Sequence, residues 1–359
     1  MAALTTVDLC RRGGSLMFAT DNAMILTLIQ RYGHDVSEQV QFNVLRSHQQ
    51  HLFLDGLAKL GLDSRFPDAD RCAMFHAFSN ALGGLPVRYG TGSDGRAWLV
   101  YDTPYWLDSP WTPSIAAAAL RPQMLLRTME AWHANNGPML GNDGLAFVFT
   151  HMVTEGDACD AGYFIDLGRN LDVTERLQVR LDEEIPDDVE LRVPEFDPAT
   201  WPIERQAKAW RNFSTDYVGG RIYWLLQQLT EQPAVDVFEY SFTLTLLQNR
   251  LVLASEFGGS AAAPVEAAAA VWAGAHRSWG DEVRIDRQAD GSVTGSISRS
   301  RLHEVAEFSP PSPRLPASFE GAVARAWDTV LSYGWPGVRV QATGGIEHAQ
   351  GWTFTFTGA

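Results

Sequence analysis

The sequence predicts an α+β fold built from two tandem copies of one domain. Three short segments of the first half recur in the second half, in the same order and at nearly equal spacing. Within each half, helical apolar spacing comes first, and strand-like alternation around hairpin turns follows. We therefore expect each copy to contain helices, a β-hairpin, a helix and a second hairpin. The helices should lie on one side of an antiparallel sheet, and a pseudo-two-fold axis should relate the copies.

The three recurring segments are separated by 195, 196 and 189 residues, so both their order and their spacing are kept. One such match arises easily by chance, whereas three in register indicate an internal duplication. The pairs are F-A-T-D-N from Phe18 with F-S-T-D-Y from Phe213, Val87–Gly95 with Val283–Gly291, and Thr154–Ile165 with Thr343–Phe354.

The helices are predicted from apolar residues spaced three and four apart, and from prolines near the expected helix starts. Each copy should have a long helical stretch, a shorter helix, and a third helix after a Pro-rich crossing. The expected ranges are Thr20–Leu60, Asp68–Leu82 and Pro113–Asn135 in the first copy, and Thr215–Phe257, Pro264–Trp279 and Pro316–Tyr333 in the second.

The strands are predicted from alternating sequences around Asp94-Gly95 and Asp290-Gly291, because glycine supplies the positive φ that a tight hairpin turn needs. Each copy should close with a second pair of strands. These are Leu145–Thr154 with Tyr163–Asp166, and Val338–Thr343 with Trp352–Thr357.

An acidic, Pro-rich segment separates the copies. Residues 167–204 hold 11 acidic and 4 basic side chains, a net charge of −7. We interpret this segment as a solvated linker that wraps the surface, with short edge strands near Gln178 and Glu190. The domains are then 1–166 (first repeat), 167–204 (linker) and 205–359 (second repeat, with a degenerate motif).

Composition excludes several classes of partner. The net charge of −15 disfavours nucleic acid and anionic membranes, and no stretch of 18 apolar residues could cross a bilayer. The three cysteines are far apart, so a disulfide framework is not expected. We expect no signal peptide and a cytoplasmic location. A small molecule is the expected partner, and homo-oligomerisation is compatible with a fused pair of domains but not required.

One turn near the end of the first copy concentrates reactive side chains. Glu155, Asp157, Cys159 and Asp160 crowd it, and His151 lies on the incoming strand. A thiol near a histidine can become a nucleophile, and neighbouring carboxylates raise one another's pKa. Alternatively the segment is only a hairpin turn, with its thiol packed inward and its acids hydrated.

The run Thr154–Asp160 resembles the "E/G-G-D-x-C" turn of domains of the 2-aminothiazoline-4-carboxylate hydrolase type and of related 4-vinyl-reductase-like domains. The element order also resembles that fold, which occurs in ligand-binding domains of aromatic-responsive regulators and in Golgi transport subunits. The resemblance covers residues 20–166. It reaches residues 215–357 only through the repeat, because His348 stands in place of Cys159 and Ile346 in place of Asp157.

The resemblance implies a hydrophobic small-molecule site and hydrolysis of a C–N bond in a cyclic, amidine-like substrate. Cys159 would be the nucleophile or a ligand, and His151 and Asp157 would form the acid–base pair. Asp102 would anchor the substrate. The motif in the second copy has lost its acid and thiol, so we expect one site per chain.

Aromatic residues cluster after the first hairpin and could form the wall of a pocket for a planar or apolar ligand. Packing into a core is the alternative. The residues are Trp98, Tyr105, Trp106 and Trp111.

The matching region of the second copy is polar instead of aromatic. Arg301 and His303 lie there, and we assign them to the other half of the substrate.

Two residue pairs have helical spacing that suits metal ligands, His48 with His51 and Cys72 with His76. Together with Cys159 the two pairs could hold zinc or manganese, but no HExxH, CxxC or similar string accompanies them. We therefore expect no cofactor, and a divalent metal is the less favoured alternative. Phosphate-loop, dinucleotide-binding and serine-hydrolase motifs are also missing from the sequence.

The leading hypothesis is therefore a small-molecule enzyme of the C–N hydrolase kind. The alternative is a non-catalytic ligand-binding or sensor domain for a small hydrophobic or aromatic molecule. A third interpretation is a structural pseudo-dimer whose motif is vestigial.

Overall fold

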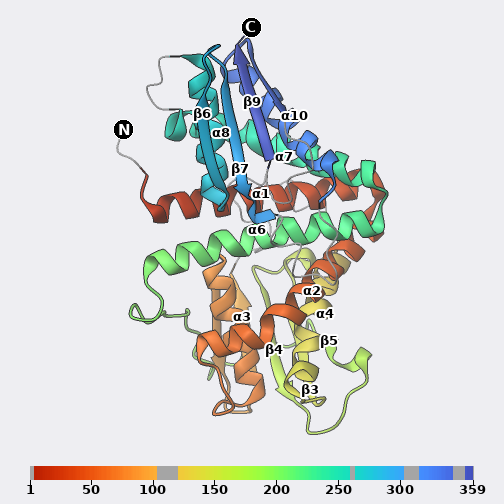
Figure 1. Ribbon diagram of the computed structural model, residues 1–359. Helices are drawn as coiled ribbons and strands as arrows, with labels where there is room; N and C mark the ends of the chain where they lie inside the picture. The colour runs from red at the N-terminus through yellow and green to blue at the C-terminus, as the bar shows by residue number, and fades with distance from the viewer. Residues whose placement is uncertain (1–3, 103–119, 259–262, 303–314, 343–351, 359) are drawn as a thin grey trace. The chain divides into compact units, whose positions relative to one another are not determined.

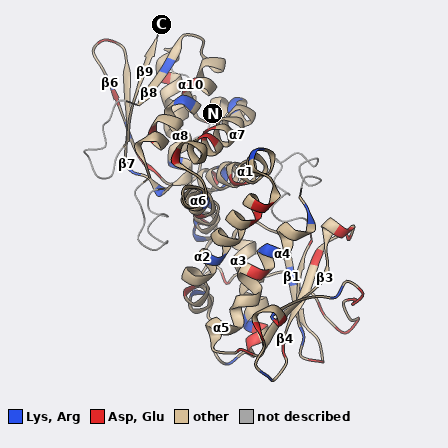
Figure 2. Ribbon diagram, turned by 90° about the vertical axis from the view of Figure 1, so that its right-hand side faces the viewer, with Lys and Arg blue, Asp and Glu red and all other residues tan. Residues whose placement is uncertain are grey.

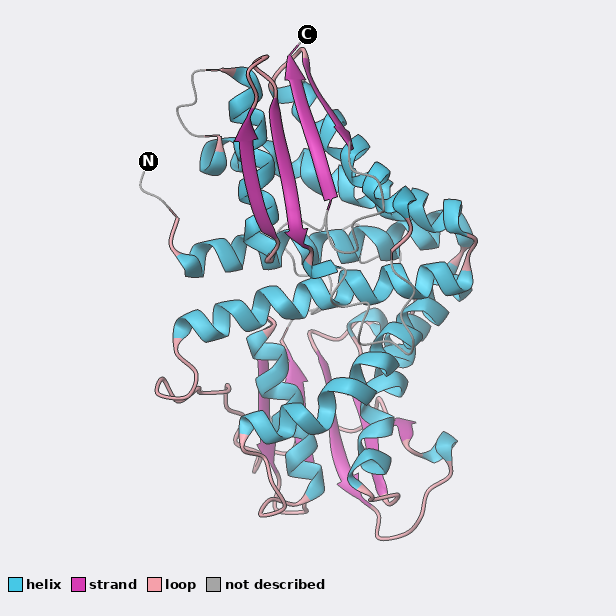
Figure 3. Cartoon of the chain, viewed as in Figure 1, coloured by secondary structure: helices cyan, strands magenta, loops and turns pink. Residues whose placement is uncertain are grey.

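The computed structural model describes residues 4–102, 120–258, 263–302, 315–342 and 352–358 (Figure 1). The chain divides into two units. Tyr32–Pro202 form the first, which we call unit A. Met1–Arg31 and Ile203–Ala359 form the second, which we call unit B. Each unit combines helices with a β-sheet (Figure 3), so the α+β class predicted from the sequence is confirmed.

Unit A follows the expected order of helices, hairpin, helix and hairpin. Its helices are α2 (His34–Leu60), α3 (Asp68–Leu82), α4 (Pro122–Trp132) and α5 (Asn136–Leu140). Its strands are β1 (Val87–Thr91), β2 (Ala97–Tyr101), β3 (Leu145–His151), β4 (Asp160–Asp166) and β5 (Leu177–Val179), and its short 3₁₀ turns are η2 (His133–Asn135), η3 (Val153–Glu155) and η4 (Val173–Glu175).

Unit B has the same order. Its helices are α1 (Thr6–Tyr32), α6 (Ile203–Gln228), α7 (Glu231–Phe257), α8 (Pro264–Trp279) and α10 (Ala317–Gly334). Its strands are β6 (Glu282–Arg287), β7 (Val293–Arg299), β8 (Val338–Ala342) and β9 (Trp352–Gly358).

The two sheets share one strand order. It is β1-β2-β4-β3 in unit A and β6-β7-β9-β8 in unit B, and every one of these neighbours is antiparallel. The predicted hairpin turns are present, with Gly95 at φ 79° and Gly291 at φ 84°. Unit A adds β5 beside β3 in the parallel direction, so its sheet is mixed and not antiparallel throughout.

The first helical stretch begins earlier than predicted and is broken. The sequence predicted one stretch over residues 20–60, whereas α1 begins at Thr6 and a new helix follows Gly33. Gly33 has φ 84°, a left-handed conformation that interrupts the helix and that glycine adopts without strain. By contrast, α3 and α8 have the predicted ends, where Pro67 and Pro264 stand at the helix starts.

The acidic linker forms an ordered strap over the sheet of unit A. It adds the strand predicted near Gln178, β5, at one edge of the sheet. Near Glu190, where a second short strand was predicted, it forms an isolated bridge between Tyr89 and Arg192 at the other edge. Val189 of the strap covers Trp98, and Ile185 and Leu191 pack against the same cluster. This sheet is therefore buried on both faces, as the continuous burial of β2 shows.

The units differ from the segments defined on the sequence. Helix α1 groups with the second half of the chain, and the strap groups with the first. Within unit B, α1 lies so close to the end of α8 that a Cβ on Gly13 would be 2.0 Å from the carbonyl oxygen of Ser278. The buried ion pair of Asp21 with Arg221 joins α1 to α6.

Replacing Gly13 with valine should therefore destabilise unit B, because the nearest atoms belong to backbone that has no room to move aside. We expect a loss of about 1–3 kcal/mol in the free energy of unfolding. Gly334→Ala is the control, since no atom lies within 4 Å of its added Cβ. Urea unfolding of both variants measures the effect, and equal stabilities would show that α1 is not closely packed.

Acidic and basic side chains are interspersed over both units (Figure 2). Many of the arginines form ion pairs, among them Arg121 with Glu38 and Arg325 with Glu239. Among the described residues, no helix has the length and apolar character needed to span a membrane.

Candidate functional site

The sheet of unit A brings the predicted turn next to the end of the first hairpin. Tyr101, the last residue of β2, pairs with Asp160, the first residue of β4. Asp102 and Cys159 extend from these two positions at the same end of the sheet. Arg88 reaches this end from β1, and its Nε donates to the two carboxylate oxygens of Asp102 at 2.9 and 3.0 Å.

Asp160 has the most unusual environment in this group. Its side chain is 1% exposed, and one carboxylate oxygen accepts a hydrogen bond from the backbone N–H of Val153 at 2.8 Å. Burial raises the pKa of Asp160 to about 7, and the nearby charge of Asp157 acts in the same direction. This carboxyl is therefore close to half protonated at neutral pH, and it can both donate and accept a proton.

Asp157 holds the turn in shape. Its carboxylate accepts a hydrogen bond from the backbone N–H of Met152 at 2.7 Å, and Gly156 has φ 106° at the end of η3. With the bond from Val153 to Asp160, the two aspartates satisfy successive amides at the start of η3. Asp157 is thus committed to a backbone contact in this structure.

Cys159 lies between these charges and is partly buried. Burial raises the pKa of its thiol, and so do the carboxylates of Asp160 and Asp102, whereas Arg88 lowers it. The protonated thiol therefore dominates at neutral pH. A nucleophilic role for Cys159 would need a base that removes this proton.

The imidazole of His151 contacts residues other than Cys159. Its Nδ1 lies 2.8 Å from the hydroxyl of Thr150, and its Nε2 lies 3.4 Å from a carboxylate oxygen of Glu184 in the strap. Within the part of the chain that the structure describes, no hydrogen bond or ion pair joins His151 to Cys159. The structure thus brings together Asp102, Asp157 and Cys159 of the predicted catalytic residues, and turns His151 toward the strap.

The predicted aromatic wall is described only in part. Trp98 is fully buried under the strap, with its ring 4.8 Å from that of Tyr163, so it belongs to the core of the covered sheet. Tyr105, Trp106 and Trp111 lie outside the described residues, in the segment that follows Asp102 directly in the sequence. Their role as a pocket wall remains a prediction.

The polar residues assigned to the other half of the substrate belong to unit B. Arg301 donates from its side chain to Asp216 at 2.6 Å and from its backbone N–H to Asp281 at 2.8 Å. Asp216 is the acid of the repeated F-S-T-D segment, which gives that segment a structural role. His303 lies outside the described residues.

Two histidines that were not assigned to the site stack in the core of unit A. The rings of His76 and His133 are 3.9 Å apart and nearly parallel, and both side chains are buried. His76 Nε2 lies 2.7 Å from the amide nitrogen of Asn136, and His133 Nε2 lies 3.3 Å from the hydroxyl of Tyr101. Burial lowers the pKa of His76 to about 3 and also lowers that of His133, so both are neutral.

The histidine pair with i,i+3 spacing is also accounted for by local contacts. His48 is buried, and His51 Nδ1 lies 2.8 Å from the carbonyl oxygen of Ser47, one turn earlier in α2. In the described ranges, no group of three or more histidine, cysteine or acidic side chains is arranged to hold a metal ion.

Sequence reasoning missed the contributions of Arg88 and Asp160. Arg88 was hidden in an alternating strand, and only the register of β1 against β2 places it near Asp102. Asp160 was noted as part of the acidic turn, but its burial follows from its place as the first residue of a central strand.

Comparison with known proteins gives no relative: no family model, no curated protein and no solved structure matches this chain.

Proposed function

We propose that the chain is a small-molecule-binding protein whose site lies in unit A around Cys159, which is near Asp160 and near the ion pair of Asp102 with Arg88. The observation that carries this proposal is the environment of Asp160, a buried carboxyl with a pKa near 7 beside a partly buried thiol. Burying such a group is costly, and perturbed carboxyls of this kind concentrate at functional sites.

The group suits a small, partly polar ligand. Protonated Asp160 can donate a hydrogen bond, and Asp102, held in place by Arg88, can accept one. We therefore propose a small heterocyclic or aromatic ligand that carries both a donor and an acceptor.

Replacing Asp160 with asparagine tests the site. The amide keeps the shape of the side chain but removes the acidic proton, so we expect affinity for a bound ligand to fall about tenfold. Asp166→Asn is the control, because Asp166 ends the same strand and is exposed. Calorimetric titration with a panel of small heterocyclic carboxylates and amides, beginning with 2-aminothiazoline-4-carboxylate, gives the measurement. A ligand that binds the Asp160 variant and the parent equally would contradict this assignment.

Hydrolysis of a C–N bond is the second candidate, and the pKa of Asp160 favours it as well. When the thiol of Cys159 bonds to the substrate carbon, its proton would pass to the Asp160 carboxylate and then to the leaving nitrogen. Water would next cleave the S–C bond and restore the thiol. In this scheme Asp160 takes the proton-transfer role that the sequence assigned to His151 and Asp157.

Cys159→Ala separates the two candidates. An enzyme that uses the thiol should lose turnover of 2-aminothiazoline-4-carboxylate or a related cyclic amidine and keep its affinity for it. A binding protein should show no turnover in the parent, and the variant should change affinity alone.

We also propose that the units descend from one duplicated domain. The shared strand order supports this, and so do Gly84 and Gly280, which follow α3 and α8 at matching positions with positive φ. Matched on their hairpin turns, the sheets align Phe164 with Phe356, because these residues pair with Ala97 and Val293.

The alignment based on the hairpin turns is shifted by three residues from the alignment of the motif segments. In it, Trp352 of unit B takes the position that Asp160 has in unit A. The second copy then has a buried indole where the first has its acid. Because unit B lacks this acid, we expect each chain to have one ligand site of this kind.

A further inference from the structure

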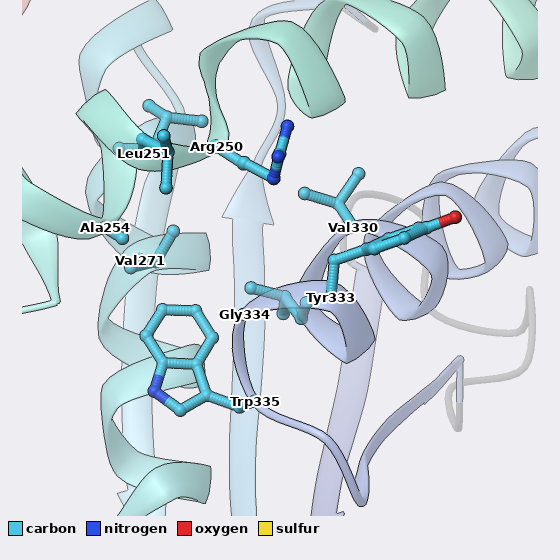
Figure 4. A pocket seen from close by; sticks show the side chains of 10 residues that line it. Arg250, Leu251, Ala254, Val271, Val330, Tyr333, Gly334 and Trp335 are labelled. Carbon is cyan, nitrogen blue, oxygen red and sulfur yellow. The ribbon is translucent and has the colours of Figure 1, made fainter.

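Unit B contains an apolar pocket of about 70 Å³ between α7, α8 and α10 (Figure 4). Leu253 and Ala254 of α7, Val271 of α8 and Val330 of α10 line it. The indole of Trp335 faces the same space from beyond the end of α10 (Figure 4). Arg250 is the one charged residue among the lining side chains, all of which are described.

The helices around this pocket can be matched by residue offset with helices of unit A. The match indicates which residues of unit A take the positions that line the pocket in unit B. Helices α2 and α7 each have 27 residues, and their starts are 197 residues apart. Buried positions of α2 fall on buried positions of α7 at this offset. The pairs are Ser37 with Ala234, Val40 with Val237, Gln41 with Phe238, Val44 with Ser241, and Leu45 with Phe242.

The correspondence fails where the pocket lies. At the same offset Phe53, fully buried in unit A, corresponds to the exposed Arg250. Helices α3 and α8 start 196 residues apart, which matches Phe75 with Val271. In unit A the rings of Phe53 and Phe75 pack edge to face with centroids 4.9 Å apart. Neither Arg250 nor Val271 has a ring, and both line the pocket of unit B.

The rim of the pocket exposes apolar surface. Leu251 is 73% exposed and Tyr333 is 68% exposed, although both flank an apolar cavity. The guanidinium of Arg250 donates one hydrogen bond, to the carbonyl oxygen of Leu247 at 2.9 Å, and no ion pair to Arg250 is formed by the described residues. Its remaining N–H groups can bind a carboxylate.

We propose that this pocket binds a small aromatic monocarboxylate. The ring would enter where unit A has phenylalanine rings, and the carboxylate would pair with Arg250. The cavity has about half the volume of the engineered cavity of roughly 150 Å³ that holds benzene, so part of the ring would rest on Leu251 and Tyr333. The inference rests on the correspondence of the two units and not on the site in unit A.

The test is calorimetric titration of the full chain with phenylacetate and with its neutral analogue phenylacetamide. Val271→Phe restores the ring found in unit A, so phenylacetate affinity should fall at least about tenfold while the thermal midpoint is retained. Ala254→Leu fills the pocket from the other wall and should have the same effect, which guards against misfolding of a single variant.

Arg250→Met tests the carboxylate contact. Phenylacetate affinity should fall about tenfold, to the level of phenylacetamide, whose own affinity should not change. Arg277→Met is the matched control, because Arg277 is also exposed and also donates to one backbone carbonyl, that of Val283. It should leave both ligands unaffected.

The proposal is overturned if the parent chain binds no phenylacetate at millimolar concentration, or if Val271→Phe and Ala254→Leu leave its binding unchanged. Asp160→Asn should not alter phenylacetate binding. The two sites can therefore fail separately, since a loss at one pocket leaves the titration of the other intact.

Discussion

Replacing Asp21 with alanine is expected to lower the free energy of unfolding by about 3–5 kcal/mol, the range found when one partner of a buried ion pair is removed. The carboxylate of Asp21 accepts two hydrogen bonds from Arg221, at 2.6 and 2.9 Å, and the two side chains are 5% and 0% exposed. Without Asp21, the guanidinium stays buried and loses the charge that compensates it. Urea unfolding monitored by tryptophan fluorescence measures the loss.

An exposed ion pair in the same unit provides the control. Glu239→Ala breaks the pair with Arg325, whose side chain is 56% exposed, and this should cost less than about 1 kcal/mol. The double variant Asp21→Leu with Arg221→Met should recover most of the loss, because it leaves no buried charge. Equal losses for Asp21→Ala and Glu239→Ala would mean that α1 is not fixed to α6 by this pair.

The elements that sequence predicted best carry strong local signals. Helices α3 and α8 were predicted to the residue, because proline stands at each start and a turn glycine follows each end. The two hairpins were predicted from Asp-Gly pairs, whose glycines do have positive φ. Such signals depend on a few neighbouring residues, so tertiary packing had no need to override them.

The pairing of α1 with the second half was not predictable in this way. Gly13 and Gly14 lower helix propensity, and only the close approach of α1 to α6 and α8 explains them. The strap, residues 167–204, was predicted to be a solvated linker because of its acidic charge. Its short apolar residues, such as Val189, cover the sheet while its acids pair outward, as Glu183 does with Arg96.

In the candidate site too, some features were predictable from neighbouring residues and others depend on the fold. The acidic turn was visible in the sequence, because its residues are adjacent. The partner Arg88 depends on strand register, and the stack of His76 on His133 joins residues from α3 and η2 that lie 57 positions apart in the sequence. Contacts of this kind follow from the fold, and a single sequence contains no local pattern that specifies them.

His76 and Asp160 should give unit A opposing pH responses between pH 7 and pH 5. The pKa of buried His76 is lowered to about 3, so the folded state stays neutral while the unfolded state takes up a proton below about pH 6.5. The stability that neutral His76 contributes to the folded state is complete above the pKa of the unfolded state, and it declines as the pH falls below that value. Over this interval the loss is about 2 kcal/mol. His133 acts in the same direction.

Asp160 has the opposite sign. Its folded pKa of about 7 lies above the unfolded value near 3.8, so the folded state takes up a proton first as the pH falls. This uptake should stabilise the folded chain by about 2 kcal/mol between pH 7 and pH 5. The effects of His76 and Asp160 nearly cancel each other, and removing one group at a time separates them, while the effect of His133 is present in the parent and in both variants.

Urea unfolding at pH 7 and pH 5 should therefore give opposite changes in stability for His76→Phe and Asp160→Asn, each relative to the parent. Relative to the parent, His76→Phe should gain about 2 kcal/mol of stability on going to pH 5, because it no longer has an imidazole to protonate on unfolding. Asp160→Asn should lose about as much over the same interval, because it cannot take up the proton. Since each variant is compared with the parent at both pH values, groups in unit B such as His276 and Glu320 cancel. Parallel pH dependence in all three proteins would show that neither group is buried in the ionisation state assigned to it, and the proposed site would lose its main support.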